Sequence, residues 1–210
     1  MDLDSRANSA QRRKVIAARE DLVNNVSILA KRRGATLYSY VNEVLEQAIR
    51  AEELGVTLRE VLDSYEFLRA NRVGGLTPLS IELLNTIARI CSENGCLQEL
   101  ERVALESGKW YGEFINMRFK PNATNLKNLS KFIERILRET RWELTEVSVA
   151  CEGTTLRVRA VSLVLNEDAT RIVAKYIEGI MNAISYRLKS SDIRKGIIDL
   201  LFEPIHQSIK

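Results

Sequence analysis

Hydrophobic side chains recur at helical spacing along the first two thirds of the chain. This pattern predicts a helix over 21–34 that ends at Gly34, and a second that starts at Thr36 as N-cap and ends at Gly55. Further helices are predicted from the capping box Thr57–Glu60 to Gly74, from Thr77 and Pro78 to Asn94, over 97–119 and over 125–140. The N-terminal half is therefore expected to be helical.

Beyond residue 140 the spacing of hydrophobic residues shortens from about 3.6 to about 2. The segment 141–165 predicts two strands joined at Glu152 and Gly153. Leu156, Val158 and Ala160 are expected to face the core, and Arg157 and Arg159 the opposite side. A helix capped by Asn166 is predicted to reach Leu188, and 196–204 is predicted as a third strand. The expected fold is α/β of the α+β type, with a C-terminal antiparallel sheet covered by helices.

Composition places the chain among soluble globular proteins, with 45% apolar and 28% charged residues. No apolar run approaches the about 18 residues of a membrane span, and the first ten residues are acidic where a signal peptide would be basic. We therefore expect a cytoplasmic protein without membrane contact. The three cysteines, Cys91, Cys96 and Cys151, are expected to be buried reduced thiols.

Charge is distributed unevenly around the net value of +3. Residues 11–34 hold seven Lys or Arg against two acidic residues, whereas 42–66 hold seven acidic residues against two Arg. A basic front end suits the binding of a polyanion, although a solvated charge run is the alternative explanation.

The segment 12–21, RRKVIAARED, fits two different structures. As a strand, it would present alternate side chains in a row that could enter a DNA groove. As a helix, it would continue into the next segment, because Val15, Ala18, Leu22, Val26 and Leu29 keep a near-heptad spacing over 10–33. The helix would then pair with a partner helix.

With the strand interpretation, residues 11–53 resemble the ribbon-helix-helix DNA-binding fold: a short strand, a helix ending in Gly34, and a helix opening at Thr36. The resemblance implies a homodimer whose paired strands lie in the major groove of double-stranded DNA. It places Arg13, Val15 and Ala17 outward, with Ile16 and Ala18 toward the core. Thr36 would offer first-turn amides to a phosphate, and Arg12, Lys14 and Arg33 would add phosphate contacts. Only Arg13 of the outward residues could hydrogen-bond a base edge.

Glycines mark the second half of the chain. Gly108 and Gly112 lie four residues apart on one predicted helix, and Gly179 lies in the middle of another. A glycine within a helix costs about 1 kcal/mol of stability relative to Ala. Such positions indicate either a tight helix crossing or a cavity, and the sequence leaves both open.

These glycines, with Trp142 and the order of elements, resemble the vinyl-reductase-type small-molecule-binding domain, which shares its fold with TRAPP subunits, over about 97–203. The resemblance implies a dimerising sensor with an apolar pocket. Candidate ligand-binding residues are Trp110, Phe114, Met117, Phe132, Tyr176 and Ile180, with ordinary core packing as the alternative for each. The cysteine-bearing end found in some members is missing, and Lys175 stands where a paired glycine is common. We therefore expect no metal site.

The sequence thus predicts a flexible leader over 1–10, a ribbon-helix-helix-like module over 11–53, a helical connector over 54–95 and a sensor or dimerisation domain over 96–210. The functional hypothesis is a ligand-responsive, DNA-binding transcription regulator that forms a homodimer or higher homo-oligomer, with an apolar small molecule as ligand. The alternative is a scaffold or assembly protein of TRAPP-like fold that does not bind DNA. We expect no catalytic residues and no cofactor: His206 is the single histidine, and no cluster of acid, base and metal-binding residues is visible.

Overall fold

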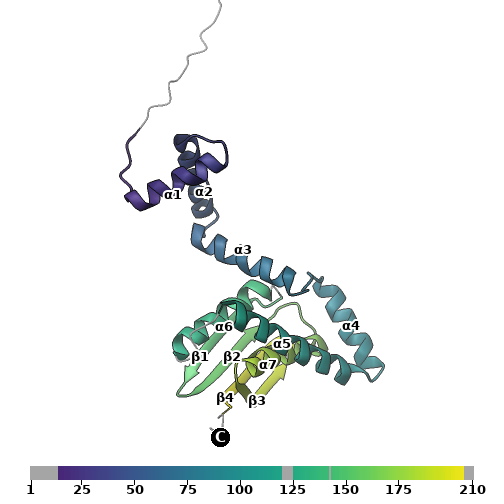
Figure 1. The fold of residues 1–210 in the computed structure, drawn as a ribbon. Coiled ribbons are helices and arrows are strands. Elements are labelled where there is room, and N and C mark those ends of the chain that lie inside the picture. The colour runs from purple at the N-terminus through teal and green to yellow at the C-terminus, as the bar shows by residue number, and fades with distance from the viewer. Residues whose placement is uncertain (1–13, 120–124, 142, 206–210) are drawn as a thin grey trace, which may run out of the picture. The chain divides into compact units, whose positions relative to one another are not determined.

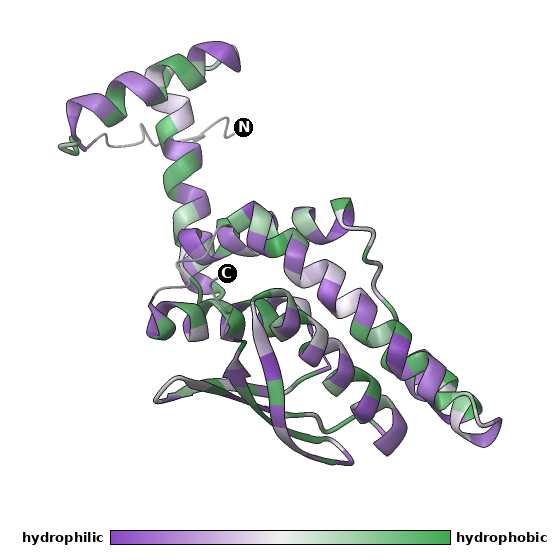
Figure 2. Ribbon diagram, turned by 60° about the horizontal axis from the view of Figure 1, so that its bottom comes forward, coloured by the Kyte–Doolittle hydropathy of each residue, from purple (hydrophilic) through white to green (hydrophobic). Residues whose placement is uncertain are grey.

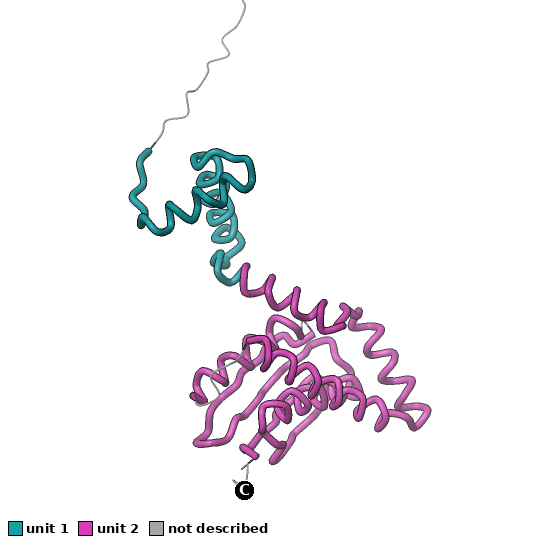
Figure 3. The backbone as a smooth tube through the Cα atoms, in the orientation of Figure 1, with its two compact units in different colours: residues 1–61 teal, residues 62–210 magenta. Residues whose placement is uncertain are grey.

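The computed structural model describes residues 14–119, 125–141 and 143–205. The chain divides into two compact units, residues 1–61 and 62–210, coloured separately in Figure 3. The predicted leader and the residues Arg12, Arg13, Trp142 and His206 lie outside the described residues. No helix among the described residues is long and apolar enough to cross a membrane.

The N-terminal unit contains α1 (Glu20–Arg32), α2 (Leu37–Glu53) and the first turn of α3 (Leu58–Val73) (Figure 1). Local signals fix the ends of these helices. Gly34 takes the left-handed conformation, with φ 67°, just after α1. The hydroxyl oxygen of Thr36 accepts from the Ser39 amide at 3.1 Å, and Glu60 accepts from the Thr57 amide at 2.7 Å. The predicted caps at Thr36 and Thr57 are thus confirmed.

The C-terminal unit continues through α4 (Ile81–Glu93), α5 (Leu97–Phe119), α6 (Leu126–Thr140) and α7 (Glu167–Ala183). Asn166 caps α7 as predicted, since its side-chain oxygen accepts from the Ala169 amide at 2.8 Å. The predicted start of α4 is wrong by several residues. Ser80, not Thr77, is the N-cap, and its hydroxyl accepts from the Leu83 amide at 3.3 Å.

A four-stranded antiparallel sheet, in the order β1-β2-β4-β3, completes this unit. Its strands are β1 (Glu146–Glu152), β2 (Thr155–Val161), β3 (Tyr186–Arg194) and β4 (Ile197–Pro204). Leu156, Val158 and Ala160 are buried, whereas Arg157 and Arg159 face the other side and pair with Asp199 of β4. The α+β class with helices against one face of the sheet is confirmed (Figure 1).

One strand was not predicted. The helix expected to reach Leu188 ends at Ala183, and the chain turns at Ser185, a non-glycine residue with φ 66°, into β3. Leu188 therefore lies in a strand. Because six of the nine residues of β3 are Arg, Lys, Ser or Asp, its hydrophobic alternation is too sparse to be recognised.

The glycines of α5 and α7 create a close crossing of the two helix backbones. A Cβ atom on Gly108 would overlap the carbonyl oxygen of Tyr176, and one on Gly179 would overlap that of Leu105. At Gly112 it would lie 2.8 Å from the Ile180 carbonyl oxygen. Of the two interpretations of these glycines, tight helix crossing is the one that the geometry supports.

Gly179→Ala tests this packing through the sign of its effect. If helix propensity alone mattered, alanine would stabilise the protein by about 1 kcal/mol. Since the methyl group meets rigid backbone, we expect the free energy of unfolding to fall by about 1–3 kcal/mol in urea denaturation. Asn182→Ala, at a partly buried position near the end of the same helix, is the control and should change the free energy of unfolding by less than about 0.5 kcal/mol. A stabilised Gly179→Ala variant would contradict the close crossing.

Candidate functional sites

Residues 14–19 lead into α1 without being part of it. They adopt no regular secondary structure, and Arg19 precedes the helix with φ −64° and ψ 139°, an extended conformation. The interpretation of 10–33 as one continuous helix is therefore wrong for residues 14–19. The ribbon interpretation stays a prediction, because a strand at this position needs a second chain to pair with.

The described residues of the predicted DNA-binding set lie in two places. Lys14, Val15 and Ala17 are exposed along the extended segment. Thr36 is exposed at the start of α2, where its hydroxyl already accepts from Ser39. Arg33 lies beside α2: its guanidinium is 3.5 Å from a Glu43 oxygen and 5.2 Å from the centre of the Tyr40 ring. Exposed contacts of this kind are weak, so Arg33 can exchange Glu43 for a phosphate at small cost.

The N-terminal unit buries very few hydrophobic side chains. Among its described residues only Ala30, Tyr40 and Ala51 are buried, and all three lie outside the main hydrophobic core. Most of the hydrophobic residues of α1 and α2, coloured green in Figure 2, remain exposed. These exposed residues are Leu22, Val23, Ile28, Leu29, Leu37, Val41, Val44, Leu45 and Ile49. Two helices with so small a core cannot be stable alone.

Three of the predicted ligand-binding residues lie on α5, on the side away from the glycine crossing. Trp110 and Phe114 stack one turn apart, with ring centroids 5.6 Å apart. The Trp110 ring also packs beside Gly74, where an added Cβ atom would lie 3.3 Å from a ring carbon. Met117 is 75% exposed. These residues form a partly exposed apolar strip rather than the wall of an enclosed cavity.

The other three predicted ligand-binding residues lie elsewhere. Tyr176 and Ile180 are buried in the core on α7, and Phe132 on α6 packs against Phe119 at 6.2 Å between ring centroids. Phe132 also lines a small surface hollow of about 310 Å³ with Asn128, Lys131 and Arg135. The structure therefore does not bring the six residues together around one pocket.

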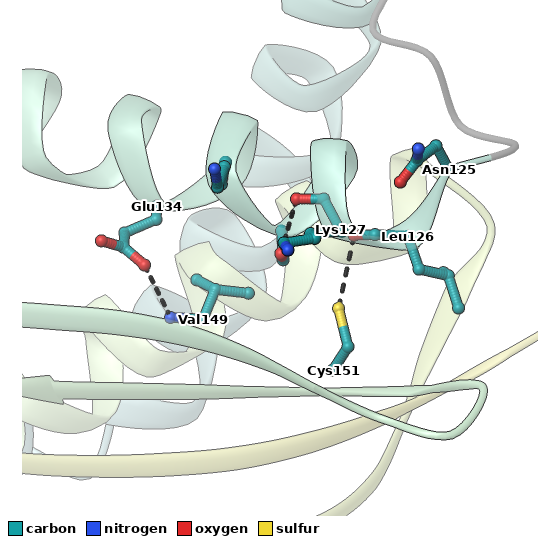
Figure 4. A pocket seen from close by; sticks show the side chains of 8 residues that line it. Asn125, Leu126, Lys127, Glu134, Val149 and Cys151 are labelled. Carbon is teal, nitrogen blue, oxygen red and sulfur yellow. Dashed lines mark hydrogen bonds between the residues drawn. The ribbon is translucent and has the colours of Figure 1, made fainter.

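A larger open groove, of about 750 Å³, lies between the N-terminal half of α6 and β1 (Figure 4). It contains none of the predicted ligand residues. Its lining includes Lys127, Lys131 and Glu134 from the helix and Val149 and Cys151 from the strand. The Cys151 thiol donates to the Leu126 carbonyl oxygen at 3.4 Å across the end of this groove.

Two side chains at this groove cap the outer edge of β1. Glu134 accepts from the Val149 amide at 3.2 Å, and Arg138 donates to the Val147 carbonyl oxygen at 2.9 Å. The two side chains also pair with each other at 3.0 Å. Because these backbone groups point away from β2, they would otherwise be open to another strand, and the pair blocks strand addition here.

Sequence reasoning missed a polar cluster within the core. The Arg141 guanidinium lies 4.6 Å from the Tyr176 ring centroid and 2.6 Å from a Glu143 oxygen. Tyr111 stacks on Tyr176 and donates to the Asn71 side-chain oxygen at 2.5 Å. Burial raises the pKa of Tyr176 to about 12 and raises that of Tyr111 as well. Both phenols therefore stay neutral at neutral pH; Tyr111 acts as a hydrogen-bond donor to Asn71, and the Tyr176 ring holds the Arg141 cation.

The cysteines contradict the expectation of burial. Cys96 and Cys151 are exposed and Cys91 is partly exposed, and all three are free thiols. Among the residues that the structure describes, no three His, Cys, Asp or Glu side chains gather where they could hold a metal ion.

Comparison with known proteins identifies no relative: no family model matches the sequence, and no curated protein matches it significantly.

The contact between Glu134 and Val149 gives a measurable expectation. Glu134→Ala removes the acceptor of an edge amide, so hydrogen exchange of the Val149 amide should become about tenfold faster, the effect of losing a hydrogen bond worth 1–1.5 kcal/mol. Exchange would be followed by NMR. Glu134→Gln keeps an acceptor oxygen of the same reach and should exchange at nearly the wild-type rate. Equal rates in wild type and Glu134→Ala would show that the carboxylate does not protect this edge.

Proposed function

We propose that the protein is a homodimeric, DNA-binding transcription regulator whose C-terminal unit responds to an apolar small molecule. Residues 11–53 would form a ribbon-helix-helix dimer, with residues 12–19 of two copies paired into a ribbon in the major groove. The single observation that carries the proposal is the exposed hydrophobic surface of α1 and α2 beside a non-helical segment.

The occupant of that hydrophobic surface, in this proposal, is a second copy of the chain. Within the described residues, no backbone hydrogen bond ties residues 14–18 to the rest of the chain, so their amides and carbonyls are available for strand pairing. Antiparallel pairing of this segment with itself would bring the two α1–α2 faces together. One association would then satisfy both the open backbone and the open hydrophobic face.

Charge supports DNA as the ligand of such a dimer. Lys14 on the extended segment and Arg32 and Arg33 at the end of α1 are exposed, and a dimer doubles their number. Polyanion binding by such residues releases counterions, which gives salt-dependent affinity. Sequence readout through Val15 and Ala17 is limited to apolar contact, so Arg13 or DNA shape would supply specificity.

The proposed ligand site uses the partly exposed strip of Trp110, Phe114 and Met117 on α5. An apolar molecule could bind there without disturbing the glycine crossing on the other side of the helix. Such a molecule would regulate DNA binding only if it had different affinities for the DNA-bound and free forms.

The proposed dimer can be tested on α2. Val44→Glu places a charge within the exposed hydrophobic stripe, so we expect sedimentation velocity to show at least a tenfold weaker dimer, because burying an unpaired charge costs several kcal/mol. Ser39→Glu, on the opposite side of the same helix and in the first turn where acidic residues are favourable, should leave the dimer intact. A Val44→Glu protein that dimerises like wild type would exclude this face as the interface.

DNA binding is the decisive measurement for the function. In a mobility-shift assay at about 50 mM salt, wild type should bind duplex DNA, and the affinity should fall steeply with added salt. Arg13→Ala with Lys14→Ala should weaken binding at least tenfold and reduce the salt dependence, whereas Lys127→Ala with Lys131→Ala in the C-terminal unit removes equal charge and should not. Absence of any shift at low salt, by a protein shown to be dimeric, would favour the scaffold alternative.

A further inference from the structure

The turn between α4 and α5 brings two cysteines together. The amide of Cys96 donates to the Cys91 carbonyl oxygen at 2.8 Å, and the Gly95 amide donates to the Ser92 carbonyl oxygen at 3.1 Å. Gly95 is left-handed, with φ 72°. This pair of nested hydrogen bonds is the Schellman motif, in which the side chains at the two outer positions normally make a hydrophobic contact. Here both of those side chains are thiols.

The backbone geometry permits a covalent bond between them. With 2.8 Å between the Cys91 oxygen and the Cys96 nitrogen, standard bond lengths limit the distance between the two Cα atoms to about 6.7 Å. Disulfides span Cα distances of about 4.4–6.8 Å. No rearrangement of the helices is needed for the two sulfur atoms to reach each other.

The two thiols already interact and are open to reagents. The two side chains are neighbours, and the interaction with Cys96 raises the pKa of the Cys91 thiol. Cys96 is the more exposed of the two. This exposure makes Cys96 the sulfur that meets an oxidant first.

We propose that Cys91 and Cys96 form a reversible disulfide on exposure to a hydroperoxide. The Cys96 thiolate attacks one peroxide oxygen, the O–O bond breaks, and the departing hydroxide takes a proton to leave as water. Cys91 then loses its proton and attacks the Cys96 sulfur of the resulting sulfenic acid; the S–S bond forms, the S–O bond breaks, and a second water leaves. The two thiols lose two electrons and two protons to one hydrogen peroxide. A dithiol reductant reverses the bond.

Peptide mapping tests the proposal on the full-length protein. Trypsin releases both cysteines in one peptide, 90–102, and Cys151 in another, 142–157. After treatment with hydrogen peroxide and alkylation of the remaining thiols, peptide 90–102 should be recovered unalkylated and two hydrogens lighter than its reduced form. Reduction with dithiothreitol before alkylation should restore two alkylated cysteines. Cys151 serves as the internal control and should remain alkylated.

Variants separate this turn from ordinary thiol oxidation. In Cys91→Ser, Cys96 should stop at the sulfenic acid and be trapped by dimedone. Gly95→Ala, which disfavours the left-handed turn, should slow disulfide formation several-fold, while Gly95→Asn, which tolerates that conformation, should not. The proposal is overturned if peptide 90–102 stays fully alkylated under peroxide, if either cysteine pairs with Cys151 instead, or if Gly95→Ala oxidises as fast as wild type.

Discussion

Direct contact between the backbones of α5 and α7 positions the other elements of the C-terminal unit. Gly108 and Gly179 each face a carbonyl of the opposite helix, so no side chain separates the two backbones. Helix α7 then lies against the sheet and buries Val173, Ile177 and Ile180. It also anchors α4, because Asn85 accepts from the Asn166 amide at 2.9 Å and donates to the Val164 carbonyl oxygen at 2.8 Å. The glycines therefore set the depth at which α5 packs against α7.

The two units differ in how far they bury their hydrophobic side chains. The C-terminal unit contains the main hydrophobic core within one chain, and the Tyr176 ring and Glu143 receive the charge of the partly exposed Arg141 beside that core. The N-terminal unit leaves the hydrophobic faces of α1 and α2 exposed. A small helical module gains stability from association when its own chain supplies too little core. This difference is the physical reason for proposing that self-association occurs through the N-terminal unit.

Elements with local signals were predictable from the sequence, and those that depend on distant contacts were not. Thr36, Thr57 and Asn166 cap helices through bonds to residues three positions away, which a linear pattern reveals. Strand β3 was not predicted because it is an edge strand that forms by pairing with β4, and this pairing leaves no local pattern in the sequence. The cluster around Arg141 joins residues 71, 111, 141 and 176, with no linear spacing to mark it. The thiols were expected to be buried because free cysteines in proteins usually are. They are exposed because they lie at the turn between α4 and α5 and on the edge strand β1.

The edges of the sheet bear on where copies of the chain can meet. On β1 the outward Val147 carbonyl accepts a hydrogen bond from Arg138, and the outward Val149 amide donates one to Glu134. On β3, at the other edge, charged side chains such as Arg187, paired with Glu203, line an exposed strand. Natural sheets use both devices to resist strand addition. Residues 15–18 carry no charged side chain, and the backbone groups of residues 14–18 have no partner among the described residues. If strands of two copies pair, the physical obstacles are therefore lowest at the N-terminal segment, next to the hydrophobic faces that association would cover.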